Sequence, residues 1–326
     1  MTLAAAAEAA HAGTFQFTQL QISGQNNSYV GGLNDNNVVA GAWSEPNGDF
    51  HGFVWANGVF TQVDGAGNTP GTTLLLGVND SGIAVGAANG GNGVFTYDIA
   101  TGQQTQIVAP QHTIMDVNGI SASGTVFGPL FVGRKQYSYT ATNGVVTPVE
   151  KKHSNVLNIA AISAQGRLLG SYYVEHGGHP SFHPGFTYAD AKFKTFYVDG
   201  DETFPTFFGL SGSIGGFYIA GQTEYGFVMS GGTTVTYKYP DALNTTLVGQ
   251  TSGGLVAGNT TYGGYVGHGF LSDGTNYYSY DPPGSTNTTI NGVNANGSLA
   301  GNYVDSDGHR YGFIAICPTG QAPCTH

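Results

Sequence analysis

The sequence predicts an all-β fold, a seven-bladed β-propeller, and three observations lead to it. A short pattern recurs seven times along the 326 residues at a nearly constant interval. Glycine is frequent, at 53 residues, and Tyr and Phe contribute 19 each, which is typical of short strands, tight turns and a packed core. The last repeat lacks its fourth strand, and a matching strand stands at the start of the chain.

The repeat centres on a tight turn, often Asn/Ser-x-x-Gly, between two short apolar strands. Successive copies start 45, 42, 42, 48, 40 and 43 residues apart, close to the size of one four-stranded blade. The copies are 32-GLNDNNVVAG-41, 77-GVNDSGIAVG-86, 119-GISASGTVFG-128, 161-AISAQGRLLG-170, 209-GLSGSIGGFYIAG-221, 249-GQTSGGLVAG-258 and 292-GVNANGSLAG-301.

Each repeat continues through a polar loop into a third strand, often marked Gly-Phe, and then a turn and a fourth strand such as 59-VFTQVD-64. The seventh repeat stops near Ile316. The segment 15-FQFTQLQI-22 resembles a fourth strand, and we expect it to complete the last blade and close the ring, which removes exposed strand edges. The predicted organisation is a single propeller over 15–316, a signal-peptide remnant or tag over 1–14, and a tail over 317–326.

The repeat resembles the HAF-type extracellular repeat family of bacterial secreted proteins. The matching positions are Gly77-Val78-Asn79-x-x-Gly82, Gly292-Val293-Asn294-x-x-Gly297, His51-Gly52-Phe53 and His268-Gly269-Phe270. The resemblance covers about residues 15–316 and implies a secreted repeat protein without indicating an activity. The third, fifth and sixth repeats depart from the Asn-x-x-Gly form.

Charge and composition exclude several functions. Only 9% of residues are charged and the net charge is −11, which argues against non-specific nucleic-acid binding and against an anionic membrane surface. No apolar run is long enough to span a bilayer. Phosphate-loop, dinucleotide, quinone and haem signatures are not evident, so no cofactor is expected. A monomer that binds a small molecule or a glycan is the expected state.

The two ends of the chain suggest export. Ala10-His11-Ala12 fits a signal-peptide cleavage site, although an expression tag or a short Ala-rich helix explains 1–14 equally. The only two cysteines, Cys317 and Cys324, are spaced for a small disulfide loop, and two thiolates do not complete a metal site. Six Asn-x-Ser/Thr sequons add weak support. The expected location is secreted, extracellular or periplasmic.

One loop holds an unusual group of histidines. His183 stands within one residue of the position that His51 and His268 hold before a Gly-Phe strand, so we expect a structural hydrogen bond. Glu175, His176 and His179 belong to the longest interval and look inserted. They are spaced to supply ligands to Zn or Cu, to contact another ligand, or to form a solvated loop. No metal is expected in this prediction.

Basic residues gather near the same loop. In a propeller, the loops between strands two and three and those between blades share one face. Arg134 and Lys135 precede a third strand, and Lys151, Lys152 and His153 join two blades; His112 lies in the preceding connection. A local positive patch there attracts a carboxylate or sulfate, and the equally weighted alternative is a patch that only aids solubility.

The channel rim supplies a second set of polar candidates, which either meet a ligand or tie blades together. The innermost strands are predicted to begin near Tyr29, Asp116, Asn158, Thr206, Thr246 and Thr289.

Three functions follow as alternatives. The first is a module that binds a glycan or another small ligand at this face or in the channel. The second is a lyase of uronic-acid polysaccharides, with Arg134 or Lys152 as cation, His153 or His179 as base and Tyr172 as acid. The third is a cofactor-free cyclase or isomerase with an aromatic pocket. The predicted ligand-binding residues are His112, Asp116, Arg134, Lys135, Lys152, His153, Asn158, Glu175, His176 and His179.

Overall fold

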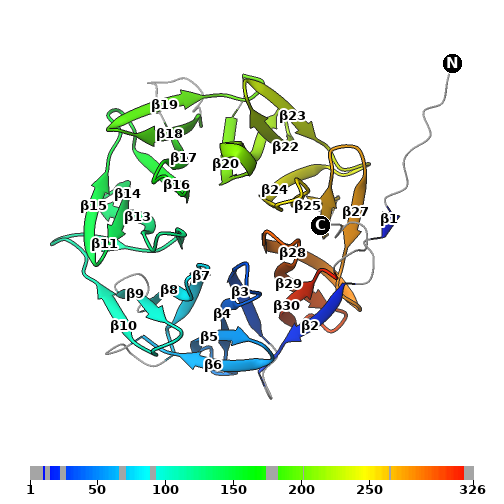
Figure 1. The fold of residues 1–326 in the computed structure, drawn as a ribbon, viewed down its shortest axis with the longest axis horizontal. Helices are drawn as coiled ribbons and strands as arrows, with labels where there is room; N and C mark the ends of the chain where they lie inside the picture. Colours follow the sequence, from blue (N-terminus) through cyan, green and yellow to red (C-terminus); the bar gives the residue numbers. More distant parts are fainter. Residues whose placement is uncertain are drawn as a thin grey trace.

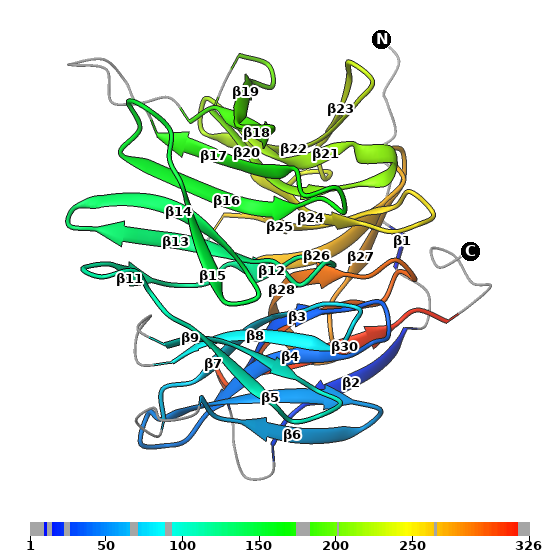
Figure 2. The ribbon, with the colours of Figure 1, turned by 60° about the vertical axis from the view of Figure 1, so that its left-hand side comes forward.

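The structure, a computed structural model, describes residues 10–11, 15–22, 27–65, 71–88, 93–173, 183–200, 202–263 and 266–318. These residues form β-strands and one short 3-10 helix, η1 (Leu210–Gly212). The fold is therefore all-β, as predicted. The sheets lie around a common axis in chain order (Figure 1), and the turned view shows them following one another as successive layers (Figure 2).

The described strands form six sheets, and we number seven units within them after the seven sequence repeats. Units 1 and 2 are four-stranded sheets of β3 (Ser28–Leu33), β4 (Val39–Ser44), β5 (Phe50–Ala56) and β6 (Val59–Val63), then β7 (Leu74–Val78), β8 (Ile83–Ala88), β9 (Gly93–Asp98) and β10 (Gln104–Ile107). Unit 3 contains β11 (Ile114–Met115), β12 (Gly119–Ile120), β13 (Val126–Val132), β14 (Lys135–Thr142) and β15 (Val145–Val149). Unit 4 contains β16 (Val156–Ile162), β17 (Leu168–Tyr173), β18 (Gly185–Ala189) and β19 (Lys192–Phe196). A parallel pairing of Gln136 with Val156 joins units 3 and 4 into one nine-stranded sheet.

The remaining units have the same antiparallel order. Unit 5 contains β20 (Glu202–Phe208), β21 (Ile214–Ala220), β22 (Thr223–Ser230) and β23 (Thr233–Tyr237). Unit 6 contains β24 (Asn244–Gln250), β25 (Val256–Thr261), β26 (Gly267–Ser272) and β27 (Tyr277–Tyr280), and β1 (Ala10–His11) pairs with β27. Unit 7 contains β28 (Ser285–Val293), β29 (Leu299–Asp305) and β30 (Arg310–Ile316).

The first long strand of the chain pairs with its last. β2 (Gln16–Leu20) runs antiparallel to β30, from the pair Gln16–Ile316 to the pair Leu20–Gly312 (Figure 1). The expected pairing of the segment 15–22 with unit 7 is therefore present. The fourth strand of this sheet comes from the opposite end of the chain.

The pairing of the strands, which is the same in every unit, explains why the second strand of the repeat contains a glycine. In every unit, one glycine of the second strand stands opposite a fully buried aromatic residue of the third, as Gly41 stands opposite Phe53 and Gly301 opposite Phe313. A Cβ on Gly41 would collide with the carbonyl oxygen of Tyr29, and one on Gly301 with that of Thr289. Because the innermost strand approaches so closely, only glycine fits at this position.

The structure shows that the fifth repeat was aligned wrongly with the others in the sequence. Its register glycine is Gly216, opposite Phe227, so Phe207 and not Gly209 holds the position of Gly32 and Gly77. The intervals around this unit are then 46 and 42 residues rather than 48 and 40. The mismatch arose because Phe207 replaces a glycine, and Gly215 opposite it leaves space for the Phe207 ring.

The repeated asparagine links neighbouring units as well as forming its own turn. The Asn34 side chain accepts the Val38 N–H at 2.9 Å and donates to the carbonyl of Asn79 at 2.9 Å. Asn79 in turn donates to the carbonyl of Ser121 at 3.1 Å. Asn294 donates to the carbonyl of Asn34 at 3.1 Å, so unit 7 is bonded directly to unit 1.

The structure describes one of the two C-terminal cysteines. Cys317 is buried just after β30, and Cys324 lies outside the described residues, so the disulfide stays a prediction. Among the described residues no helix is long and apolar enough to cross a membrane.

Candidate functional site

Strand direction divides the molecule into two faces. The loop face carries the connections between units and the loops between second and third strands. The turn face carries the short turns between first and second strands and those between third and fourth strands, such as Asp190-Ala191.

Three histidines of the loop face, His51, His183 and His268, each lie beside a carboxylate. His183 Nδ1 lies 3.0 Å from Glu202 Oε1, and its ring packs between Tyr173 and Phe204 at 5.1 and 5.2 Å. His51 and His268 also lie beside carboxylates, Asp64 and Asp281, at 3.0 and 2.7 Å, although these follow the fourth strand of the same unit whereas Glu202 begins the next unit. His183 therefore has the structural role predicted for it. A carboxylate stands 13 residues after both His51 and His268, but Phe196 stands 13 residues after His183, so this spacing does not indicate Glu202.

The predicted site between units 3 and 4 is described in part. Glu175, His176 and His179 lie outside the described residues. Arg134, Lys135, Lys152 and His153 are exposed, and the Gln136 N–H donates to the Asn155 carbonyl at 3.1 Å, which places their two loops side by side. His112 is exposed in the connection from unit 2 to unit 3.

Tyr172 is not available in the way the lyase hypothesis requires. Its side chain is buried, its hydroxyl lies 3.0 Å from Thr195 Oγ1, and the Lys151 ammonium lies 4.6 Å from its ring centroid. Tyr172 thus packs within unit 4 and holds Lys151, which makes it a poor general acid for a ligand on the loop face.

The channel rim contains one equivalent residue from each innermost strand. The register gives Tyr29, Leu74, Asp116, Asn158, Phe204, Thr246 and Thr289. Leu74 was missing from the sequence-based set, and Phe204 replaces Thr206 because of the alignment correction. Asn158 Oδ1 accepts a hydrogen bond from Asn118 at 2.8 Å, and Thr206 donates to the Leu247 carbonyl at 2.8 Å. These two candidates therefore tie units together. Asp116 is exposed and accepts the N–H of Val117.

A pocket of about 330 Å³ opens between units 1 and 2 on the loop face. Its lining is almost wholly apolar: Tyr29, Val30, Gly31, Ala42, Phe50, Leu74, Leu75 and Leu76. Tyr29 and Phe50 have ring centroids 5.9 Å apart, and Arg310 lies 5.7 Å from the Tyr29 ring. Leu74, which begins the inner strand of unit 2, is 36% exposed.

The pocket lies where Ala42 stands in place of an asparagine that links units elsewhere. At the equivalent place between units 6 and 7, Asn259 donates to the Ile290 carbonyl and accepts the Ile290 N–H, at 2.9 and 2.7 Å. Between units 7 and 1, Asn302 accepts the Val30 N–H at 2.9 Å and Asn291 donates to the Val30 carbonyl at 2.6 Å.

In unit 1 these two positions are Ala42 and Gly31, which have no polar side-chain atoms to bridge to Leu75 of unit 2. Ala87 occupies the same position in unit 2, but there Met115 and Val117 fill the interface. Sequence reasoning missed the pocket, and its signal is an alanine after the repeat glycine together with three successive leucines, Leu74 to Leu76.

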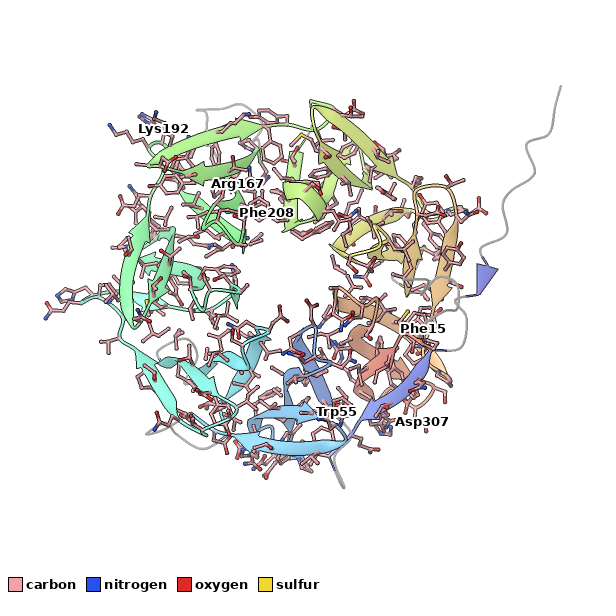
Figure 3. The ribbon with its side chains drawn as sticks, in the orientation of Figure 1. Phe15, Trp55, Arg167, Lys192, Phe208 and Asp307 are labelled. Atoms are coloured by element: carbon pink, nitrogen blue, oxygen red, sulfur yellow. The ribbon has the colours of Figure 1, made fainter. Side chains whose placement is uncertain are left out.

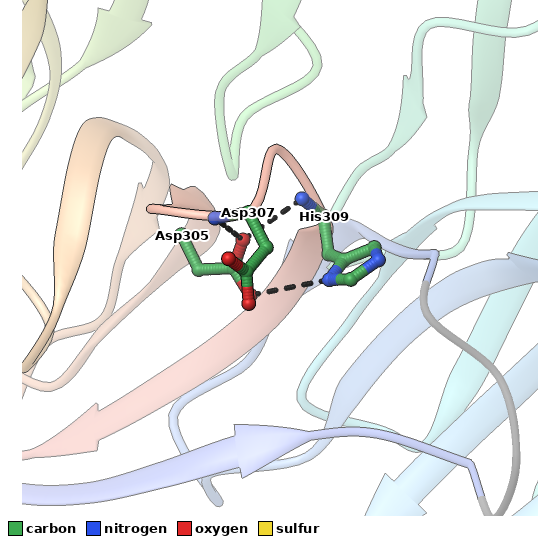
Figure 4. A group of neighbouring side chains, drawn as sticks. All are labelled: Asp305, Asp307 and His309. Atoms are coloured by element: carbon green, nitrogen blue, oxygen red, sulfur yellow. Dashed lines mark hydrogen bonds and ion pairs between the residues drawn. The ribbon is translucent and has the colours of Figure 1, made fainter.

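A second group, Asp305, Asp307 and His309, has metal-ligand spacing in the segment 305-DSDGH-309 (Figure 4). Asp305 Oδ1 accepts the N–H groups of Asp307 and His309, both at 2.9 Å, and His309 Nδ1 lies 3.4 Å from Asp305 Oδ2. Although desolvation opposes it, bonding from these N–H groups lowers the pKa of the Asp305 carboxyl. Because the contacts are those of a hydrogen-bonded turn, we assign the group a structural role.

Comparison with solved structures identifies the fold class as a β-propeller. The chain is similar to virginiamycin B lyase from Staphylococcus aureus, with a TM-score of 0.58, 11% identity, and 93% and 99% of the two chains covered. It is similar to an oligogalacturonate lyase in complex with manganese, with a TM-score of 0.61, 9% identity, and coverage of 95% and 98%.

The β-propeller domain of the Trilobed protease from Pyrococcus furiosus gives a TM-score of 0.60 at 9% identity, covering 90% of this chain and 94% of that one. No family model and no curated protein sequence matches the chain. At these identities the similarity establishes the fold and not the function.

Proposed function

We propose that the chain is a secreted, seven-bladed β-propeller, closed by β2 and related to the HAF-type repeat proteins, that binds a small apolar ligand between units 1 and 2. The observation that carries the binding proposal is the apolar pocket at Ala42 and Gly31. Blade closure is supported by the β2–β30 pairing and by the bonds from Asn291, Asn294 and Asn302 to unit 1.

The lining favours an aromatic or aliphatic ligand over a sugar. Tyr29 and Phe50 offer ring faces, and Leu74 and Leu76 offer apolar surface that a ligand removes from water. The hydroxyl groups of a sugar would lose their hydrogen bonds to water against such a lining. We therefore place the glycan hypothesis elsewhere on the molecule.

A single polar feature sets the expected orientation of the ligand. In the equivalent interfaces, the backbone N–H of the inner strand donates to an asparagine oxygen, as Val30 does to Asn302 and Ile290 to Asn259. With Ala42 in that place, a ligand carbonyl takes the role of the missing asparagine oxygen at Leu75. The preferred ligand is thus apolar with one hydrogen-bond acceptor.

The lyase alternative rests on the other sector of the loop face, with Arg134 or Lys152 beside His153 or His179. A uronate polysaccharide assay by ultraviolet absorbance of the unsaturated product tests it. Loss of activity in His179→Ala would support it, whereas an inactive wild-type protein would leave binding as the function.

The binding proposal is tested with N-phenyl-1-naphthylamine, whose fluorescence rises when it leaves water. We expect saturable binding to the wild type and, in Leu74→Ser with Leu76→Ser, affinity lower by about tenfold or more, since burial of each leucine contributes about 1.5–3 kcal/mol. The matched control is Leu210→Ser on the turn face, where the side chain is 44% exposed and lines no part of this pocket. Equal binding by all three proteins would contradict the proposal.

A further inference from the structure

Another hollow lies on the turn face, away from the apolar pocket. A groove of about 870 Å³ runs between the first turn of unit 4 and that of unit 5. Arg167, Asp190, Ser163, Gln165 and Ser211 contribute polar side chains to it, and Phe208 contributes an aromatic ring. Its chemistry is thus opposite to that of the pocket between units 1 and 2.

Arg167 is held in one orientation in this groove. Its guanidinium carbon lies 4.7 Å from the Phe208 ring centroid, and Nη2 donates to the Gly212 carbonyl at 3.2 Å (Figure 3). A guanidinium has five N–H donors, so one bond to Gly212 leaves donors for another group. A planar cation fixed on a ring is suited to a carboxylate, because two parallel hydrogen bonds form without further loss of side-chain freedom.

Arg167 is also an exception within the repeat. The position three residues before the register glycine is Val38, Ile83, Thr125, Ser213, Leu255 and Ser298 in the other units. The repeat therefore does not require a charge there. In units 1, 2 and 7 the asparagine of the first turn bonds to the next unit. In unit 4 the Arg167 side chain makes the bond to the next unit, at Gly212 of unit 5.

Two exposed lysines accompany Arg167 in unit 4. Of the seven Lys and Arg residues in 134–194, Arg134, Lys135, Lys151 and Lys152 belong to the loop face, which leaves Arg167, Lys192 and Lys194. Lys192 and Lys194 of this set are exposed on β19, the outer strand of unit 4, where Figure 3 shows Lys192. Arg167 and Lys192 thus supply positive charge near the turn end of unit 4, where Asp190 is the carboxylate among the residues that line the groove.

Hydroxyl partners continue beyond the groove. A second hollow of about 310 Å³ lies on the other side of the unit 4 turns and shares Ile162, Ala189 and Asp190 with the groove. Its lining includes Tyr188 and a row of four threonines, Thr125, Thr140, Thr142 and Thr147. Asp190 and Ala191 form the hairpin turn between the two hollows with φ of 49° and 57°. Alanine rarely adopts this left-handed conformation, so the surrounding fold holds the turn in place.

We propose that this groove binds an acidic oligosaccharide, with a sugar carboxylate on Arg167 and ring hydroxyl groups on Asp190 and the threonine row. A glycan chain has the length to cross the unit 4 turns, and its hydroxyl groups match the acceptors and donors that line both hollows. This site is independent of the apolar pocket on the loop face.

The test is calorimetric titration with a β-1,4-linked glucuronic acid trisaccharide and with cellotriose, which has the same linkage without carboxylates. We expect the acidic trisaccharide to bind, and cellotriose to bind at least about tenfold more weakly, because only the carboxylate reaches the guanidinium in charge-assisted bonds. Raising the salt concentration should weaken the acidic ligand alone.

Substitutions distinguish binding in the groove from non-specific attraction of the anionic ligand to positive charge. Arg167→Ala should lower affinity by about tenfold or more, and Arg167→Lys should lower it too, since lysine lacks the planar pair of donors. The matched control is Lys151→Ala, which removes another cation from an aromatic face, 4.6 Å from the Tyr172 ring, outside the groove. Its affinity should equal that of the wild type.

Hydrogen exchange measured on the wild-type protein locates the binding site without any substitution, so a folding defect in a variant does not affect the result. The acidic trisaccharide should slow exchange in the segments 162–167, 189–192 and 208–213. Protection elsewhere, equal affinity for cellotriose, or unchanged binding by Arg167→Ala would overturn the proposal. Failure of the apolar probe to bind would leave this result untouched.

Discussion

The interface between units 7 and 1 and that between units 1 and 2 have the same backbone register and opposite contents. In the first, Asn291 and Asn302 bond to the carbonyl and N–H of Val30. In the second, Gly31 and Ala42 stand in their places and a pocket of about 330 Å³ remains. The difference teaches that the link varies between interfaces. Where Ala42 replaces the linking asparagine a hollow remains, whereas at Gly31 the two units approach so closely that an added Cβ would collide with the Leu75 carbonyl.

The register glycine is present in every unit, so its substitution should reduce stability equally in unit 1 and in unit 7. Gly41→Ala and Gly301→Ala each place a Cβ against an inner-strand carbonyl, of Tyr29 and Thr289 respectively. We expect each to lower the free energy of unfolding by about 3 kcal/mol, because the neighbour is backbone and has no easy way to move. Denaturant unfolding measures both.

The control for this pair is Gly263→Ala, where an added Cβ meets nothing within 4 Å. It should change stability by less than about 0.5 kcal/mol. A mild effect of Gly41→Ala alone would show that the pocket side of unit 1 relaxes, which would weaken the comparison.

The linked interfaces should depend on their asparagines. Asn259→Ala removes both bonds to Ile290, and we expect a loss of about 2–3 kcal/mol from two unpaired backbone groups. Thermal and denaturant unfolding measure it. Asn47→Ala, in an exposed loop with bonds only to Asp49, is the matched control and should be nearly neutral. If both variants melt alike, the amides do not hold the units together.

Each unit has one fully buried aromatic residue opposite its register glycine. Tyr139 occupies the place of Phe53 and Phe313, and its hydroxyl has no hydrogen-bond partner among the described residues. Tyr139→Phe should therefore raise the free energy of unfolding by about 1 kcal/mol at pH 7. Burial, with the nearby charge of Asp116, also raises the pKa of Tyr139.

The raised pKa gives this variant a pH signature. A tyrosine whose folded pKa exceeds the unfolded value contributes its stability below that unfolded value, about pH 10, and loses it as the pH rises further. Wild-type stability should then fall by about 1.4 kcal/mol per pH unit more steeply than that of Tyr139→Phe. Parallel curves above pH 10 would show that Tyr139 ionises without unfolding the protein.

The fold could be predicted because backbone geometry imposes it on every copy. The register glycines and the turn asparagines recur, so their spacing shows the units before any contact is known. Unit 5 was misaligned because Phe207 took a glycine position and shifted the apparent pattern. The role of His183 could be predicted for the same reason, since His51 and His268 repeat it.

The candidate site could not be predicted in this way. Sequence reasoning searched for polar and titratable residues, and the pocket arises where such a residue is absent, at Ala42. An alanine is informative only once Asn259 and Asn302 are known to bridge units from the same register. Arg167 was not among the predicted site residues, because its contacts with Phe208 and Gly212 come from the next unit and are visible only in the fold.

The most direct test of the central claim restores the missing link. Ala42→Asn should place an amide opposite Leu75, fill the pocket and raise the free energy of unfolding by about 1 kcal/mol, the scale of one such hydrogen bond. N-phenyl-1-naphthylamine is titrated into this variant and the wild type. The account predicts saturable binding by the wild type and affinity at least about tenfold lower in Ala42→Asn, the scale of losing one buried leucine-sized contact. Equal affinity in a fully folded Ala42→Asn would contradict it.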